Sequence, residues 1–163
     1  MERKRQFLPT LLERLLDDEP RIETERFDRF FFDSKKMRAI VQKDITEIMN
    51  STNIEDRLDL KRFKLVANSV LNYGVGAMIG NYANQHNWGT IEKTIRNALL
   101  RFEPRILAES LIVSPSIDSD HPSRNGLILF EIKGLISWKP YPIDLCINGA
   151  YDVETEKVDL KII

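Results

Sequence analysis

The sequence contains a single cysteine, Cys146, among its 163 residues. A lone thiol forms no internal disulfide and supplies too few ligands for a structural zinc site, so the composition fits a reducing compartment. No apolar run approaches the roughly 20 residues that cross a bilayer, and the apolar stretch near the N-terminus is too short for a signal-peptide core. We therefore expect a cytoplasmic protein with no direct membrane insertion.

An excess of charge of one sign is also lacking. Lys and Arg number 24 and Asp and Glu number 25, so no basic field is available to attract nucleic acid or anionic lipid. Glycine and proline, at seven residues each, are too few for a collagen-like or low-complexity chain. The length and composition therefore predict one ordinary globular domain, with no nucleic acid partner.

Motifs for catalysis and cofactor binding are missing as well. There is no CxxC or HExxH, and the glycines at 74, 76 and 80 lack the preceding strand and the spacing of a phosphate-binding loop. His86 and His121 are far apart in polar stretches, which is typical of ordinary loop histidines. Carboxylates are abundant, but nothing singles out the pair that glycoside hydrolysis needs. We predict no catalytic residue, no metal site and no cofactor.

A short leucine-rich helix is expected over residues 10–19. Thr10 and Glu13 form a capping-box pattern at its start, and Pro20 stops it. Its apolar face would consist of Phe7, Leu8, Leu11, Leu12, Leu15 and Leu16. Because an isolated helix of about two turns is marginal in water, this face must pack on its own domain or on another protein.

Two helices are predicted in the next third of the chain. The first runs from about residue 34 to residue 49, with Asp33 or Ser34 as its cap and a continuous apolar face. A second, weaker one covers about residues 63–71, where asparagine and serine interrupt the helical spacing. Residues 72–89 are rich in glycine and asparagine and predict a loop.

The clearest helical pattern begins at Thr90, which we expect to be the N-cap. Apolar residues then recur at helical spacing up to Phe102. Because Pro104 disfavours helical geometry at the preceding Glu103, the helix should end near Arg101 or Phe102.

After residue 105 the hydrophobic period changes from helical to alternating. Strands are predicted over residues 106–113, 127–138, 143–148 and 158–162, with a polar loop over 114–126 and a turn over 152–156. Helices followed by consecutive strands predict an α+β fold with a small, largely antiparallel sheet on which a helix packs. We assign residues 1–33 to an N-terminal helix and linker, and residues 34–163 to a single α+β domain.

One charged constellation surrounds the helix-to-strand junction. It comprises Arg96, Arg101, Glu103, Pro104 and Arg105. Pro104 restricts the backbone, so the flanking acid and base can pair with each other or face a partner. The residues alone favour a helix stop with a local ion pair, which contributes about 0–1 kcal/mol when exposed.

Three blocks, together with the alternating pattern of residues 127–132, carry a family resemblance. Residues 94–105 (TIRNALLRFEPR), 69–74 (SVLNYG) and 127–132 (LILFEI) resemble the TssE family of type VI secretion baseplate subunits, which are similar to a wedge protein of contractile-tailed phages. Residues 11–20 (LLERLLDDEP) resemble the N-terminal stretch of that family in particular. Residues 75–80 depart from the family pattern, because they lack the proline and the acid expected there.

The resemblance implies a structural, non-enzymatic subunit. Its partners would be the wedge subunits TssF, TssG and TssK and the TssB/TssC sheath, whose polymerisation it would seed at the inner-membrane-anchored baseplate. The Glu-Pro-Arg motif is regarded as functional in the family, which favours an interface role over a local pair. The partner-binding residues expected on this basis are Glu103, Pro104, Arg105, Arg101, Arg96, Leu11, Leu12, Leu15 and Leu16.

Strand addition is a mechanism consistent with both the pattern and the resemblance. An antiparallel sheet offers unpaired edge groups to a sheath strand, and the candidate edges are residues 106–113 and 158–163. Two alternatives stay open: a lysozyme-like peptidoglycan hydrolase, and a regulatory binding module like IraD, which shares the core of this family. The regulatory module does not explain residues 11–20.

Overall fold

The structure is a computed structural model that describes residues 33–59, 61–76, 88–116, 123–124, 126–152 and 154–162, together with positions 11, 15, 20, 21 and 23. Several predictions lie outside these residues. They concern Phe7, Leu8, Leu12, Leu16, His86, His121 and most of the linker before residue 33.

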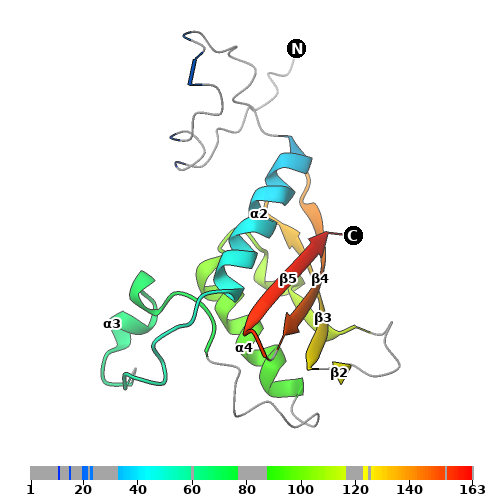
Figure 1. The fold of residues 1–163 in the computed structure, drawn as a ribbon. Helices are drawn as coiled ribbons and strands as arrows, with labels where there is room; N and C mark the ends of the chain where they lie inside the picture. The colour runs from blue at the N-terminus through cyan, green and yellow to red at the C-terminus, as the bar shows by residue number, and fades with distance from the viewer. Residues whose placement is uncertain are drawn as a thin grey trace.

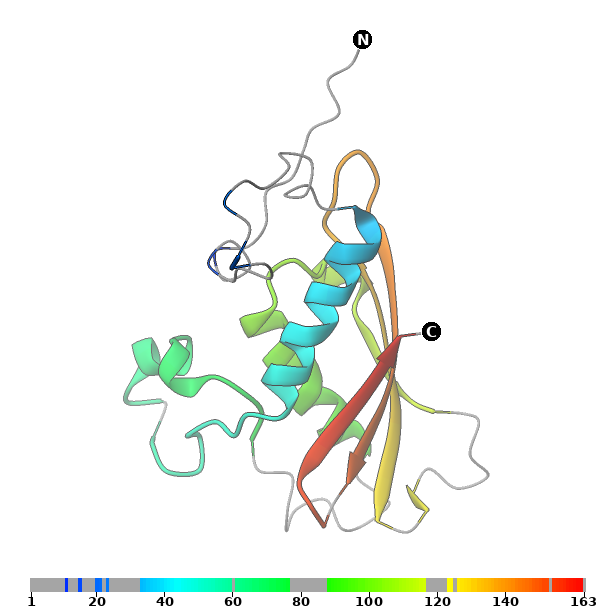
Figure 2. The ribbon, with the colours of Figure 1, turned by 45° about the horizontal axis from the view of Figure 1, so that its top comes forward.

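The described residues form two layers, a helical layer and an antiparallel sheet (Figures 1 and 2). Helices α2 (Ser34–Met49) and α4 (Trp88–Phe102) lie on one face of the sheet. Among the described residues, no helix lies on the opposite face (Figure 2). None of the described helices is both long and apolar enough to span a bilayer.

Helix α2 has the predicted bounds. Asp33 is its N-cap, and the side chain accepts a hydrogen bond from the backbone N–H of Lys36 at 2.7 Å. The apolar face predicted from the spacing is buried in the core, as Ile40, Val41, Ile45, Ile48 and Met49.

Helix α4 ends at Phe102, as Pro104 predicts. Its start differs, because the helix includes Trp88 and the expected N-cap Thr90 lies within the first turn. Trp88 packs against the core, so burial of an aromatic ring accompanies the earlier start. The buried face consists of Ile91, Ile95, Ala98 and Leu99.

The prediction of one helix over residues 63–71 is wrong. Two short helices are present, α3 (Lys64–Ala67) and η2 (Val70–Asn72). Ser69 separates them, because its hydroxyl donates to the carbonyl of Val66 and accepts from the N–H of Leu71. The α3–η2 segment protrudes from the side of the helical layer (Figure 1).

Gly74 joins this protrusion to the end of α2. Its φ of +109° and the closeness of Ser51 exclude any side chain, since a Cβ would lie 2.1 Å from the Ser51 carbonyl oxygen. The neighbouring Val75 donates to the same carbonyl at 2.9 Å and accepts from Asn53 at 3.0 Å. These bonds tie the base of the protrusion to the domain.

The sheet confirms the predicted α+β class, and every pair of its strands is antiparallel. The strand order is β1-β3-β4-β5, and β2 also pairs with β3. The strands are β1 (Ile112–Pro115), β2 (Ser123–Arg124), β3 (Leu127–Ile136), β4 (Ile143–Asp152) and β5 (Lys157–Ile162). The edges are therefore β1 with β2 on one side and β5 on the other.

The strand predicted over residues 106–113 is mostly wrong. Ile106 forms an isolated bridge with Ile136, but Ala108–Ser110 turn into a 3₁₀ helix before β1 begins. Ile106 pairs with Ile136 and Ile112 pairs with Lys133. The segment from Ile106 to Ile112 is therefore three residues longer than the β3 segment that it faces, and the extra residues loop out. The hydroxyl of Ser110 takes the place of a backbone acceptor, because it accepts a hydrogen bond from the N–H of Leu135 at 2.8 Å.

Side chains alternate between the two faces of the sheet as predicted. On β4, Ile143, Leu145 and Ile147 are buried beneath the helices, whereas Asp144 and Asn148 are exposed on the open face. Phe130 of β3 is fully buried opposite Gly149, where a Cβ would lie 2.3 Å from the ring. The ring thus occupies the space of the missing side chain.

Candidate partner-binding site

The Glu-Pro-Arg motif lies where α4 ends. The N–H of Glu103 still donates to Leu99 at 2.8 Å, and the chain then turns away at Pro104. Glu103 is only 2% exposed, so its carboxylate requires compensation within the protein. Arg105 supplies it, with Nε donating to Glu103 Oε1 at 2.6 Å and Nη2 donating to Oε2.

A second carboxylate completes this group. Nη2 of Arg105 also donates to Asp44 of α2, so one guanidinium joins the end of α4 to the neighbouring helix. The hydrogen bonds to Glu103, together with those to Asp44, raise the pKa of Arg105 above its ordinary value, although burial acts in the opposite direction. The local ion pair that the residues alone favour is therefore present, and Asp44 extends it.

Tyr73 borders this cluster. Its ring packs edge-to-face on Phe102, with centroids 5.2 Å apart and planes inclined by 61°. Partial burial raises the pKa of Tyr73, and the negative charges of Glu47, Asp44 and Glu103 raise it further.

Arg96 lies on a different side of α4. Its guanidinium donates to the carbonyl of Leu111, and its Nη2 donates to the carbonyl of Ala108 at 3.3 Å. The side chain thereby satisfies carbonyls of the 3₁₀ segment that precedes β1. Arg96 fixes the path of the chain into the edge strand.

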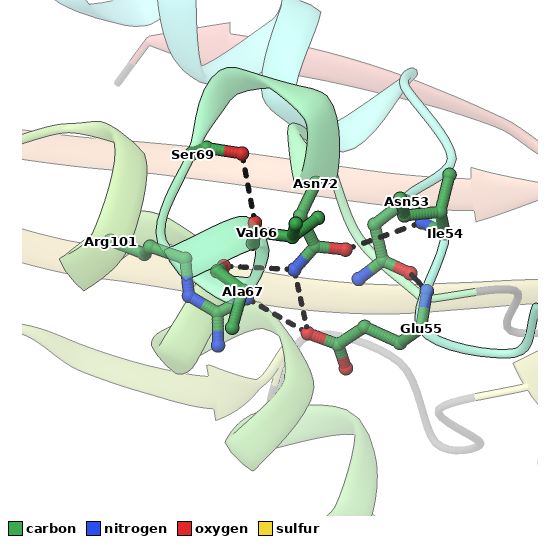
Figure 3. Close-up of polar contacts among 8 residues, drawn as sticks. All are labelled: Asn53, Ile54, Glu55, Val66, Ala67, Ser69, Asn72 and Arg101. Carbon is green, nitrogen blue, oxygen red and sulfur yellow. Dashed lines mark hydrogen bonds and ion pairs between the residues drawn. The ribbon is translucent and has the colours of Figure 1, made fainter. Parts of the chain in front are cut away.

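Arg101 reaches toward the α3–η2 protrusion. Its Nη1 contacts Glu55 Oε1 at 2.8 Å, and the same oxygen accepts from Asn72 Nδ2 at 3.1 Å (Figure 3). Burial raises the pKa of Glu55, but the hydrogen bonds from Arg101 and Asn72 and the Arg101 charge outweigh it, so the pKa is lowered. This network links α4 to the protrusion.

Asn72 is the centre of that network and is fully buried. Besides Glu55, its amide nitrogen donates to the carbonyl of Ala67 at 3.0 Å (Figure 3). Its amide oxygen accepts from the N–H of Ile54 at 3.3 Å. Every polar atom of this side chain is thus used to hold the protrusion together.

The structure therefore separates the residues that the sequence groups at the junction. Arg96, Arg101 and Arg105 each bind a different set of partners within the chain, and Pro104 is exposed beside them. Sequence reasoning missed Asp44, Glu55 and Asn72. No local pattern predicts a role for Asp44, since an acid on the polar face of a helix is expected to be solvent-exposed. Asn72 lies within the SVLNYG block, which could have pointed to it.

A shallow polar cleft lies beside the Arg101 network. Its volume is about 180 Å³, and Asn53, Asp56, Asn97 and Arg101 contribute to its walls. This is below the roughly 300–1,000 Å³ of pockets that hold small molecules. In the part of the chain that the structure describes, no three His, Cys, Asp or Glu side chains are arranged to hold a metal ion.

The leucine-rich N-terminal block is represented by two described positions. Leu11 and Leu15 are both helical and are 70% and 72% exposed. Two large apolar side chains at helical spacing are thus open to a partner.

Comparison with known proteins places this arrangement in a family. Residues 35–141 match the family described as baseplate wedge protein gp25. No curated protein and no solved structure matches the chain. The matched segment covers more than half of the chain and runs from α2 through α4 and β3, including Glu103 and Arg105. The chain therefore belongs to the family of baseplate wedge protein gp25, whose members are components of phage-tail-like baseplates.

Proposed function

We propose that this chain is the TssE-type subunit of a type VI secretion baseplate, where it joins the wedge to the contractile sheath and seeds sheath polymerisation. The membership of the wedge family carries this proposal. The placement of the Glu-Pro-Arg motif between α4 and an edge strand supports it, because that position can connect a wedge contact to a sheath contact.

The wedge contacts are assigned to the N-terminal leucines and to Arg96 and Arg101 of α4, which would meet a partner in addition to their bonds within the chain. Leu11 and Leu15 offer apolar side chains to TssF, TssG or TssK. Deletion of residues 1–20 is expected to abolish wedge binding. A regulatory module like IraD would keep its partner after the same deletion.

The sheath contact is assigned to an edge of the sheet. Strand β5 is six residues long and ends one side of the strand order. Asn50 already bonds both backbone groups of Val158, and Gln42 bonds the carbonyl of Leu160. A TssB/TssC strand that adds at this edge would therefore have to displace these two side chains. The β1 edge is shorter, with four residues, but it lies next to the Arg96 contact. Strand addition at either edge would template the first sheath ring.

Sheath formation in cells tests the role of the motif. Reversal of charge at Glu103 is unsuitable as a test, because this carboxylate is buried and a cation in its place is expected to unfold the domain. Arg105→Lys keeps the charge but loses the bidentate fork, and Asp44→Asn weakens the same cluster outside the motif. At equal soluble protein, Arg105→Lys should abolish fluorescent TssB sheaths while Asp44→Asn keeps them. Sheath loss that simply follows thermal stability in both variants would contradict the interface role.

Catalysis is not part of the proposed function. A muramidase needs a protonated acid and a second carboxylate across a cleft. At the motif, Glu103 is buried and both it and Asp44 bind Arg105, so neither is placed to act on a sugar. We expect purified protein to release no fragments from peptidoglycan, and measurable release would contradict the structural assignment.

A further inference from the structure

The α3–η2 segment carries an exposed apolar surface, which we call the ridge. It consists of Leu65, Val70 and Leu71, which are 90%, 83% and 68% exposed. Side chains of this size are rarely so exposed together unless something covers them. The ridge is also firmly built, since the buried Asn72 fixes the backbone beneath it.

The residues from 61 to 72, which include the ridge, carry charge of one sign, and the exposed Asp59 lies just before them. Residues 61–72 include Lys61, Arg62 and Lys64 and contain no acidic residue. All three basic side chains are exposed, and no acid of the described residues forms an ion pair with them. A ligand for this surface would therefore be apolar on one face and acidic at its margins.

The chain itself contains a segment of that chemistry. Residues 10–20 contain four leucines at helical spacing, four acids and one base. The two leucines that the structure describes, Leu11 and Leu15, are exposed. One chain thus has two open apolar surfaces in segments of opposite charge. Residues 61–72 carry three net positive charges, and residues 10–20 carry three net negative charges.

We propose that residues 10–19 dock on the ridge of the same chain. The leucines cover Leu65, Val70 and Leu71, and the acids Glu13 and Asp17–Glu19 lie against the basic margin of the ridge. Both surfaces are exposed in the structure, so docking is a second arrangement of the N-terminal segment. It needs no baseplate partner, so it goes beyond the baseplate role and does not depend on it. In an assembly, a partner that binds the leucines has to displace them from the ridge.

The connecting chain is long enough for this contact. Residues 20–32 span up to about 45 Å when extended. Helix α2, which separates the tether from the base of the protrusion, is 16 residues and therefore about 24 Å long. The tether also favours the contact within one chain, because it sets an effective concentration in the millimolar range.

Disulfide trapping in the full chain tests the contact. In a Cys146→Ser background, Leu15→Cys is paired with Leu71→Cys, and the matched control pairs Leu15→Cys with Lys161→Cys on the exposed β5. Under mild oxidation, the first pair should form an intrachain bond at least about tenfold faster than the control, as intact monomer mass and peptide mapping report. Equal rates would overturn the proposal, and so would bonds formed mainly between two chains.

Charge exchange gives a second, independent readout. Lys61→Glu with Lys64→Glu changes only exposed side chains, and it should slow trapping of the first pair severalfold. Adding Glu13→Lys with Asp17→Lys should restore the rate. An unchanged rate in the first variant, or no recovery in the second, would show that residues 10–19 do not lie on the ridge.

Discussion

Arg105 donates from Nε to Glu103 Oε1 at 2.6 Å while its Nη2 binds Glu103 Oε2 and Asp44. One guanidinium thereby neutralises a buried carboxylate and connects α4 to α2. The bidentate hydrogen bonds of an arginine are strongest where water is excluded. The Glu103–Arg105 pair therefore stabilises the fold whether or not a partner protein also contacts it.

Loss of Arg105 should therefore destabilise the domain. Arg105→Met leaves Glu103 buried without its partner, and we expect the free energy of unfolding to fall by about 2–4 kcal/mol. Glu103→Gln removes the charge but keeps an acceptor, so a smaller loss of about 1–2 kcal/mol is expected. Urea unfolding of the single and double variants measures this. A double variant as unstable as the sum of the singles would show that the two side chains are not coupled.

Asn72 should matter more than its neighbour Asn68. Asn72→Ala leaves the N–H of Ile54 and the carbonyl of Ala67 without their partner, which should cost about 2–4 kcal/mol. Asn68 is exposed, and Asn68→Ala should change stability by less than about 0.5 kcal/mol. Thermal unfolding compares the two. Similar losses in both variants would mean that the amide network does not hold the protrusion.

Gly149→Ala should strain the core. The added methyl group would meet the Phe130 ring at 2.3 Å, and the resulting overpacking should cost about 1–3 kcal/mol. Gly134→Ala is the matched control on β3, since its nearest contact would be an ordinary 3.5 Å from Ile106 Cγ2. If Phe130 is the cause, Phe130→Leu should recover part of the loss in the Gly149→Ala background. No recovery would point to the backbone instead.

Cys146 should react slowly with alkylating agents near neutral pH. Burial raises the pKa of its thiol, and the hydrogen bond to Glu131 and the charge of that carboxylate raise it further, so the reactive thiolate forms only at higher pH. Glu131→Gln removes the charge, and the pH profile of iodoacetamide labelling should shift to lower pH. Asp144→Asn, on the same open face, should leave the profile unchanged. A profile that does not move in Glu131→Gln would contradict the assigned cause.

Elements with a strong local signal could be predicted from the sequence. Helix α2 has its predicted bounds because Asp33 supplies a cap and every fourth or third residue is apolar. The alternation of β4 likewise assigned each side chain to its face. In these segments, local preference and tertiary packing agree.

The remaining errors have tertiary causes. Residues 106–113 alternate like a strand, but the side chain of Ser110, and not a backbone carbonyl, accepts the hydrogen bond from β3. Residues 108–110 form a 3₁₀ helix there. The contact between Asp44 and Arg105 joins positions 61 residues apart, and no spacing rule predicts it. Burial of Asn72 also depends on a network that closes only when α4 and the protrusion meet.

Co-expression with the wedge subunits tests whether this chain is a baseplate component. If this chain is the TssE-type component, a tagged copy expressed with TssF and TssG should purify with both in a fixed ratio that survives size-exclusion chromatography. Recovery of a TssF–TssG complex that lacks this chain would contradict the proposed baseplate role.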